Sequence, residues 1–161
     1  MIRHIKVSHL GILVAAVFVA SMSSFFVLQG ILSDWYRALL VPLYMPSGFT
    51  SSVVWMVLFI LITVAGILSW HAPIDKKARD RVRFLFIAIA FLNFYWSFLF
   101  FVTTNIGLAA FDAIVLFFVS LALMLKLYRW RKTVAYLLLP AVVWLAFAAY
   151  LNLVIWAVNR V

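Results

Sequence analysis

The chain has 161 residues, of which 69% are hydrophobic and only 11% are charged. Soluble globular domains carry about 25% charged residues, so this composition excludes a soluble enzyme and a disordered chain. Cysteine is absent, which excludes disulfides, thiolate metal sites and a cysteine nucleophile. The sequence therefore predicts one integral membrane domain, residues 1–161.

Uncharged segments long enough to cross a bilayer recur five times. Because a spanning helix needs about 20 mainly apolar residues, we expect spans at about 10–33, 51–70, 84–104, 106–125 and 134–158. Turn residues separate them, including Pro42, Pro46 and Pro73. The first uncharged run is longer than the 7–15 residues of a typical signal-peptide core, so we expect it to be retained. Strands of alternating polarity, which a β-barrel needs, are missing. The predicted fold is all-α, a five-transmembrane-helix bundle.

Lys and Arg residues are distributed unevenly over the two ends of such a bundle. Only Arg37 and Arg160 fall on the side opposite the N-terminus. The same side as the N-terminus receives Arg3, Lys6, Lys76, Lys77, Arg79, Arg81, Arg83, Lys126, Arg129, Arg131 and Lys132. Since cytoplasmic loops carry the excess of basic residues, we expect a cytoplasmic N-terminus and an outside C-terminus, in a bacterial inner membrane. The net charge of +9 is read as this topology signal, and nucleic acid is not expected as a partner.

Few residues could carry chemistry. The histidines at 4, 9 and 71 lie near span ends without the spacing of metal ligands, so no metal site is expected. Asp112 is the one ionisable residue inside a span. A membrane carboxylate is a functional candidate by default, but this one lies near the start of its helix, where the backbone dipole favours it. We favour structural anchoring over a proton relay.

Aromatic residues gather on helical faces of three spans. These faces comprise Trp55 and Phe59 in the second span, Asn93, Trp96, Ser97 and Phe100 in the third, and Trp144, Ala148, Leu151, Asn152 and Ile155 in the fifth. A flat apolar ligand with a few polar edges would fit such a lining. Ordinary helix packing is the alternative, and spacing alone favours it. Interfaces between membrane helices, however, usually consist of small residues. The large aromatic residues here therefore leave a ligand cavity as the second hypothesis.

Several motifs resemble those of the TspO/MBR family, which comprises the bacterial tryptophan-rich sensory proteins and the mitochondrial translocator protein, or peripheral benzodiazepine receptor. Residues 35–42 (WYRALLVP), followed by Pro46 and Trp55, are similar to its first long loop and second helix. Residues 92–101 (LNFYWSFLFF) resemble its third-helix signature, LNxxWxxxFF. Asp112 falls where its fourth helix has Asp, and residues 138–152 are similar to its fifth-helix pattern, LxPYxxWxxFxxxLN.

The resemblance implies a five-helix bundle, commonly a homodimer, whose pocket is closed by the first loop and binds tetrapyrroles such as protoporphyrin IX and haem. Carried over by position, the ligand-binding residues would be Tyr36, Trp55, Phe59, Asn93, Trp96, Trp144, Ala148 and Leu151. The resemblance implies a membrane sensor or regulator, with porphyrin or haem as ligand and no obligatory cofactor. Its alternatives are a transporter of such molecules and a light- and oxygen-dependent porphyrin breakdown, for which Trp55 and Trp144 would be the catalytic candidates. Some positions depart from the family: Val41 replaces Lys, Tyr44 replaces a frequent Trp, and Ala141 replaces Tyr.

Overall fold

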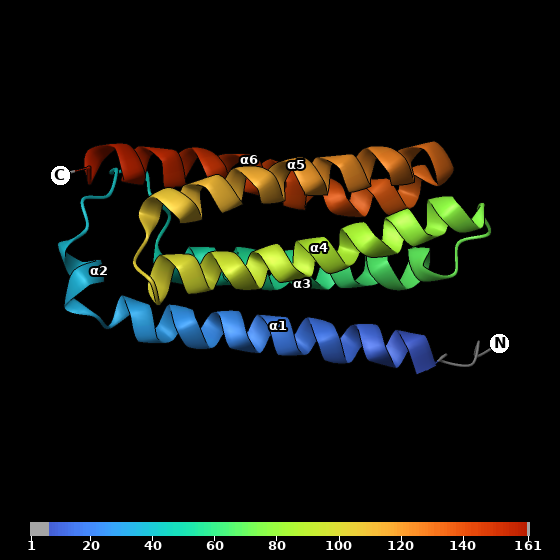
Figure 1. The fold of residues 1–161 in the computed structure, drawn as a ribbon, viewed down its shortest axis with the longest axis horizontal. Helices are drawn as coiled ribbons and strands as arrows, with labels where there is room; N and C mark the ends of the chain where they lie inside the picture. The colour runs from blue at the N-terminus through green and yellow to red at the C-terminus, as the bar shows by residue number, and fades with distance from the viewer. Residues whose placement is uncertain (1–6, 161) are drawn as a thin grey trace.

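The computed structural model describes residues 7–160, and five long helices dominate it (Figure 1). These are α1 (Val7–Ile31), α3 (Gly48–Trp70), α4 (Lys76–Phe101), α5 (Ile106–Trp130) and α6 (Lys132–Val158), with a short α2 (Asp34–Ala38) between the first two. Each long helix is long and apolar enough to cross a membrane, and the described residues contain no strand. The all-helical, five-span fold predicted from the sequence is confirmed.

Side-chain caps explain where most of the helices begin. Ser47 accepts a hydrogen bond from the backbone N–H of Thr50, and Asp75 and Asn105 cap α4 and α5 in the same way. These caps satisfy backbone donors that have no partner inside the helix. Because Asp75 is the cap, α4 starts at Lys76 and includes basic residues that precede the apolar span expected from about residue 84. Ser33 caps α2, a helix too short to be expected from periodicity.

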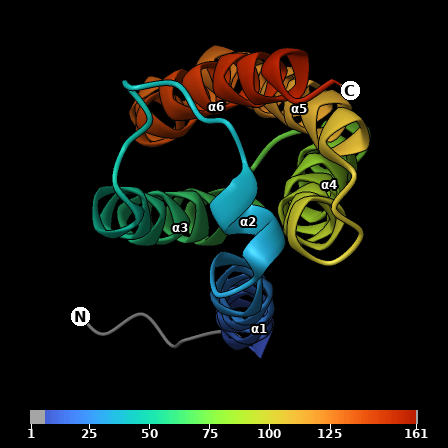
Figure 2. The same ribbon diagram turned by 90° about the vertical axis from the view of Figure 1, so that its left-hand side faces the viewer.

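Four helices form a ring, and the fifth covers one side of it (Figure 2). Around the ring, α4 packs against α5, α5 against α6, α6 against α3, and α3 against α4. Helix α1 lies in the groove between α3 and α4. The two diagonal pairs, α4 with α6 and α3 with α5, have no direct backbone contact. Any side chain that joins a diagonal pair therefore has to cross the interior of the ring.

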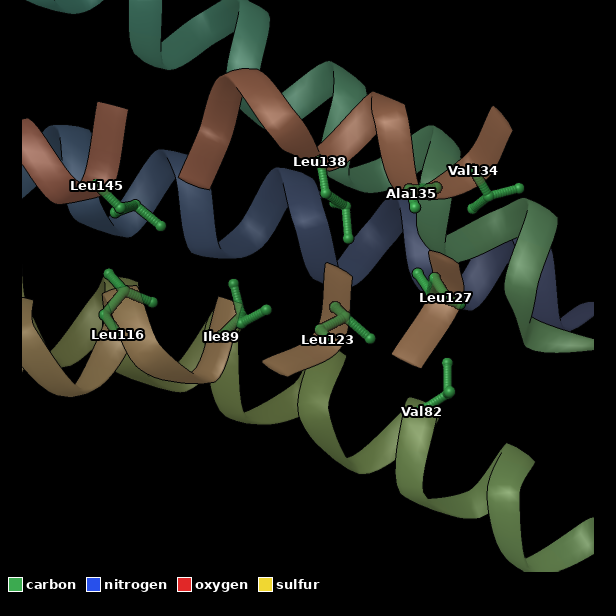
Figure 3. Packing of buried hydrophobic residues seen from close by; sticks show 10 residues of the cluster. Val82, Ile89, Leu116, Leu123, Leu127, Val134, Ala135, Leu138 and Leu145 are labelled. Atoms are coloured by element: carbon green, nitrogen blue, oxygen red, sulfur yellow. The ribbon is translucent and has the colours of Figure 1, made fainter. Parts of the chain in front are cut away.

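The main apolar core lies where α5 is packed between α4 and α6 (Figure 3). Its central residues on α5 are Leu116, Leu123 and Leu127, each at most 2% exposed. Facing them are Val82 and Ile89 of α4 and Val134, Ala135, Leu138 and Leu145 of α6. Lipid tails are as apolar as these side chains, so moving the side chains out of lipid gives no hydrophobic gain. The van der Waals contacts of this close packing therefore supply the energy that holds the helices together.

The bundle has two distinct ends. At one of them lie α2, the loop of residues 39–47, the turn of residues 102–105 and the end of α6; we call this the loop end. At the other lie the start of α1, residues 71–75 and the connection at Arg131; we call this the basic end. Arg83 strengthens the basic end, because its guanidinium donates two hydrogen bonds, of 3.1 and 2.8 Å, to the carbonyl of Trp70 at the end of α3.

Candidate functional site

Most of the predicted ligand-binding residues lie in the part of the bundle nearest the loop end, and Trp144 lies near the middle of α6. At about 1.5 Å per helical residue, Trp96 lies about 8 Å, Trp55 about 10 Å and Trp144 about 21 Å from the nearest helix end at that side. Phe59, Asn93, Ala148 and Leu151 fall between these depths on the same three helices, α3, α4 and α6. Tyr36 lies on α2, above them. The candidates therefore extend from the loop end to about the middle of the bundle.

A hydrogen bond joins α4 and α6 across the interior of the ring. The indole Nε1 of Trp96 donates to Oδ1 of Asn152 over 3.1 Å. Since the backbones of these two helices do not touch, this pair bridges the space between them. Asn152 is 4% exposed, and its amide also donates to the carbonyl of Ala148. The pair therefore forms a partly buried polar crosslink about 9 Å below the loop end.

The other two interior tryptophans have different surroundings. Trp55 packs against the main core, and its ring centroid lies 5.9 Å from that of Phe59. Trp144 lies against Phe147, with ring centroids 5.6 Å apart. The indole Nε1 of Trp144 is buried and has no hydrogen-bond partner. A buried donor without a partner lowers the stability of a protein by about 1–3 kcal/mol. A ligand whose acceptor atom bonds the indole N–H of Trp144 would recover this energy.

The cluster beneath α2 is aromatic. The ring centroids of Tyr36 and Phe101 are 5.9 Å apart. Trp96 is stacked on Phe100, and their ring centroids are 5.4 Å apart. Trp35 meets Phe100 edge-on. Asn93 is buried and donates to the carbonyl of Ile89 in its own helix, so its amide does not bridge helices. Burial raises the pKa of the Tyr36 phenol above its usual range.

Asn152 was not among the ligand-binding residues predicted from the sequence. Its position on the α6 face is visible from spacing, and the motif that contains it is part of the resemblance. Its pairing with Trp96 could not be predicted, because the two residues are 56 positions apart in the sequence. The aromatic contacts of Trp35, Phe100 and Phe101 with Tyr36 and Trp96 were missed for the same reason.

The loop of residues 39–47 runs across the loop end and is fastened to α6 (Figure 2). Asn159 accepts a hydrogen bond from the backbone N–H of Leu40 (3.0 Å) and donates one to the carbonyl of the same residue (2.8 Å). Tyr44 donates to the hydroxyl of Tyr150 over 3.2 Å, and the two rings are stacked. This hydrogen bond raises the pKa of the Tyr44 phenol. The loop thus ties the end of α2 to α6 before it reaches the start of α3.

Two shallow surface hollows lie away from these aromatic residues. One, of about 540 Å³, lies at the basic end and is lined by Asp75, Lys76, Lys77, Asp80, Arg81 and Phe84. The other, of about 440 Å³, lies at the loop end between the 103–107 turn and the side chains of Trp156 and Arg160. None of the predicted ligand-binding residues lines either hollow.

The ionisable candidates lie in two places, Asp112 on α5 and the pair His9 and His71 at the basic end. Asp112 is 4% exposed on the α5 face that packs against its neighbours, and its Oδ2 has no hydrogen-bond partner. At the basic end His9 and His71 come together, with ring centroids 5.5 Å apart, and Ser8 hydrogen-bonds His71. Within residues 7–160 no three potential metal ligands form a group, and His4 lies outside the described residues.

Comparisons with known proteins agree with this architecture. The family model described as TspO/MBR matches residues 11–157. The chain belongs to the TspO/MBR family. Family membership supports a membrane protein with a sensor or transporter kind of role, and it agrees with the lipid environment that the five apolar helices require.

Individual relatives cover most of the chain. A tryptophan-rich protein TspO of Bacillus cereus is 32% identical over 125 residues, which are 78% of this chain and 80% of the relative. One of Archaeoglobus fulgidus is 29% identical over 147 residues, 91% and 94% of the two chains. The translocator protein of Sus scrofa is 29% identical over 127 residues, 78% and 75% of the two chains. Similarity therefore extends from archaeal and bacterial proteins to a mammalian one.

Proposed function

We propose that the protein is a membrane sensor or regulator that binds a tetrapyrrole, such as protoporphyrin IX or haem, inside the helical ring. The observation that carries this proposal is the set of large aromatic side chains, Trp55, Trp96 and Trp144, that α3, α4 and α6 hold between the loop end and the middle of the bundle. A porphyrin is a flat π-system, and stacking on indole and phenyl rings is its natural mode of recognition.

The polar groups in this region fit such a ligand. Trp144 offers a buried N–H donor without a partner, which an acceptor on the ligand would satisfy. The indole N–H of Trp96 is already used by Asn152, so Trp96 would contribute its ring. Ligand entry between α4 and α6 would have to displace or bypass this crosslink.

Binding is better supported than coupled transport. Secondary transporters commonly hold their substrate at discontinuous helices near the bilayer midplane. Here each of the five long helices is continuous over its described residues, with Pro140 accommodated inside α6. Five spans also do not divide into two equal repeats. We therefore assign the sensor role first and keep porphyrin transport as the alternative.

The binding proposal is tested by titrating the purified protein with protoporphyrin IX and with haem while recording tryptophan emission. We expect saturable quenching. Trp55→Ala and Trp144→Ala should each weaken binding by about 1–3 kcal/mol, the value of a lost aromatic stack.

The matched control is Trp70→Ala, because Trp70 lies at the basic end under the guanidinium of Arg83 and should not affect affinity. Unchanged affinity in both Trp55→Ala and Trp144→Ala would contradict the site and leave ordinary helix packing as the role of these rings. The homodimer implied by the family resemblance is a separate proposal, and light scattering of the detergent-solubilised protein measures it.

A further inference from the structure

We propose that the outward face of α4 at the basic end binds one anionic phospholipid, with the lipid phosphate between Lys77 and Arg81. The headgroup would occupy the hollow of about 540 Å³ that these two side chains help to line. The acyl chains would follow the apolar continuation of the same helical face, which comprises Phe84, Phe91 and Tyr95. This site is on the outer surface of the bundle and does not depend on the proposed tetrapyrrole binding.

The acidic groups that line the hollow are already bound by the protein. Asp75 accepts a hydrogen bond from the backbone N–H of Ala78 at 3.1 Å. Asp80 lies between two cations, with its carboxylate oxygens 3.0 Å from Nζ of Lys76 and 3.5 Å from the guanidinium of Arg83. The charge of Asp80 is therefore compensated from within α4, and it does not compete for the remaining basic side chains.

The basic side chains of α4 point in different directions. Arg79 and Arg83 serve the bundle itself, because both donate to backbone carbonyls of residues 70–74. Lys77 and Arg81 are exposed instead, and neither forms an ion pair within residues 7–160. The topology signal requires basic residues at this end of the bundle, but it does not require two unpaired cations to share one outward face.

Two cations near the start of a helix are unfavourable without a partner. The backbone dipole disfavours positive charge there, and like charges four residues apart repel each other. Nε of Arg81 donates to the carbonyl of Lys77 at 3.3 Å, which leaves the terminal guanidinium nitrogens of Arg81 to bind another group. A phosphate between the two side chains would offset both repulsions and accept charge-assisted hydrogen bonds.

The same face continues as an aromatic track along α4. Residues 77, 81, 84, 88, 91 and 95 follow one another at intervals of four and three, which places them on one side of a helix. Phe84 and Phe91 are 67% and 59% exposed, and Phe91 is stacked on Tyr95. From Phe84 to Tyr95 the track is about 17 Å long, close to the hydrocarbon depth of one leaflet, about 15 Å.

The occupant has to match both parts of this face. Free phosphate or a nucleic acid would satisfy the two cations but would make no use of exposed phenyl rings within the hydrocarbon layer. A zwitterionic lipid would cover the rings but brings its own cation to the hollow. A phospholipid with net negative charge, such as phosphatidylglycerol, complements the cations with its phosphate and the aromatic track with its chains.

The first experiment compares two lipids that differ only in headgroup. The detergent-solubilised protein is mixed with equal amounts of dioleoyl phosphatidylglycerol and dioleoyl phosphatidylcholine, and native mass spectrometry measures how much of each stays bound. We expect the native chain to retain one phosphatidylglycerol in preference. Lys77→Gln and Arg81→Gln should each lower this preference about fivefold, and the double variant roughly 25-fold.

The matched control removes two charges from the same end of the bundle, outside the hollow. Arg129 and Lys132 are exposed, and neither lines the hollow, so the Arg129→Gln, Lys132→Gln double variant should keep the preference. An equal loss in both double variants would show a general effect of net charge and overturn the site. An unchanged preference in the Lys77→Gln, Arg81→Gln variant would overturn it as well.

The second experiment tests the aromatic track and the source of the phosphate. Phe84→Ala should lower the retention of both lipids severalfold and leave their ratio unchanged, because the ring contacts chains and not headgroups. Phe111→Ala on α5 is the control, since Phe111 is almost equally exposed, at 65%, and should have no effect. Equal losses in these two variants would overturn the track.

Inorganic phosphate at about tenfold excess over the lipid should leave phosphatidylglycerol bound. Displacement of the lipid by inorganic phosphate would show that the hollow recognises the free anion and would overturn the assignment to a phospholipid.

Discussion

At the residue scale, the interior of the ring contains polar groups of two kinds. Asn93 satisfies its amide within its own helix, whereas Asn152 satisfies the indole of Trp96 on another helix. Both are asparagines on aromatic helical faces with almost the same burial, 6% and 4% exposed. Their consequences for stability should nevertheless differ, because only one of them leaves a partner without a bond when it is replaced.

We therefore expect Asn152→Leu to destabilise the protein by about 0.5–1.5 kcal/mol, the net contribution of the hydrogen bond lost at the partly buried indole of Trp96. Asn93→Leu should cost less, since the carbonyl of Ile89 keeps its backbone partner in the helix. Thermal unfolding in detergent, followed by tryptophan emission, compares the two variants. Equal losses would show that the bridge across the ring contributes nothing beyond local burial.

At the element scale, α1 is the least embedded long helix, and its contact with α4 depends on one glycine. A Cβ atom built on Gly30 would lie 2.1 Å from Cδ1 of Phe101 and 2.7 Å from its Cβ. Real side chains do not approach this closely, so the absence of a side chain at Gly30 permits the two helices to meet at the loop end. The same phenyl ring also contacts Tyr36, which links this packing to the aromatic cluster beneath α2.

Gly30→Ala should consequently destabilise the bundle by about 1–3 kcal/mol, as overpacking does, and should disturb the aromatic cluster under α2. Gly11→Ala is the matched control in the same helix, because a Cβ there meets nothing within 4 Å. That variant should be neutral or stabilising by about 0.5–1 kcal/mol through helix propensity. Thermal unfolding measures both, and a stabilising Gly30→Ala would contradict the close-packing argument.

At the scale of the whole molecule, the charge distribution and the fold agree on two unlike ends. The described basic residues at 76–83 and 126–132 all lie at the basic end, and the loop end has Arg37 and Arg160. Since basic loops stay in the cytoplasm, we propose that the loop end faces outside. The mouth of the proposed site would then open away from the cytoplasm.

Cysteine labelling in intact bacterial cells tests this orientation, since the native chain contains no cysteine. A membrane-impermeant thiol reagent should label Leu43→Cys from outside, and should label Lys77→Cys only after the membrane is permeabilised. The controls are the native chain, which should remain unlabelled, and permeabilised cells, in which both variants should react. Labelling of both positions from the same side would contradict the five-span topology.

The sequence by itself determined the number of spans, the two-ended charge pattern and the approximate position of each span. These properties follow from local chemistry: the bilayer demands about 20 apolar residues per crossing, and motifs such as residues 92–101 keep their order along the chain. The aromatic faces of α3, α4 and α6 could also be predicted, because helical spacing sets them.

Only the tertiary structure decided which faces meet. In lipid, outward and inward faces are both apolar, so periodicity does not tell one from the other. The pairs Trp96–Asn152, Tyr44–Tyr150 and Leu40–Asn159 join residues 56, 106 and 119 positions apart. Their partners depend on the order of helices around the ring and on the path of the 39–47 loop, which no local pattern specifies.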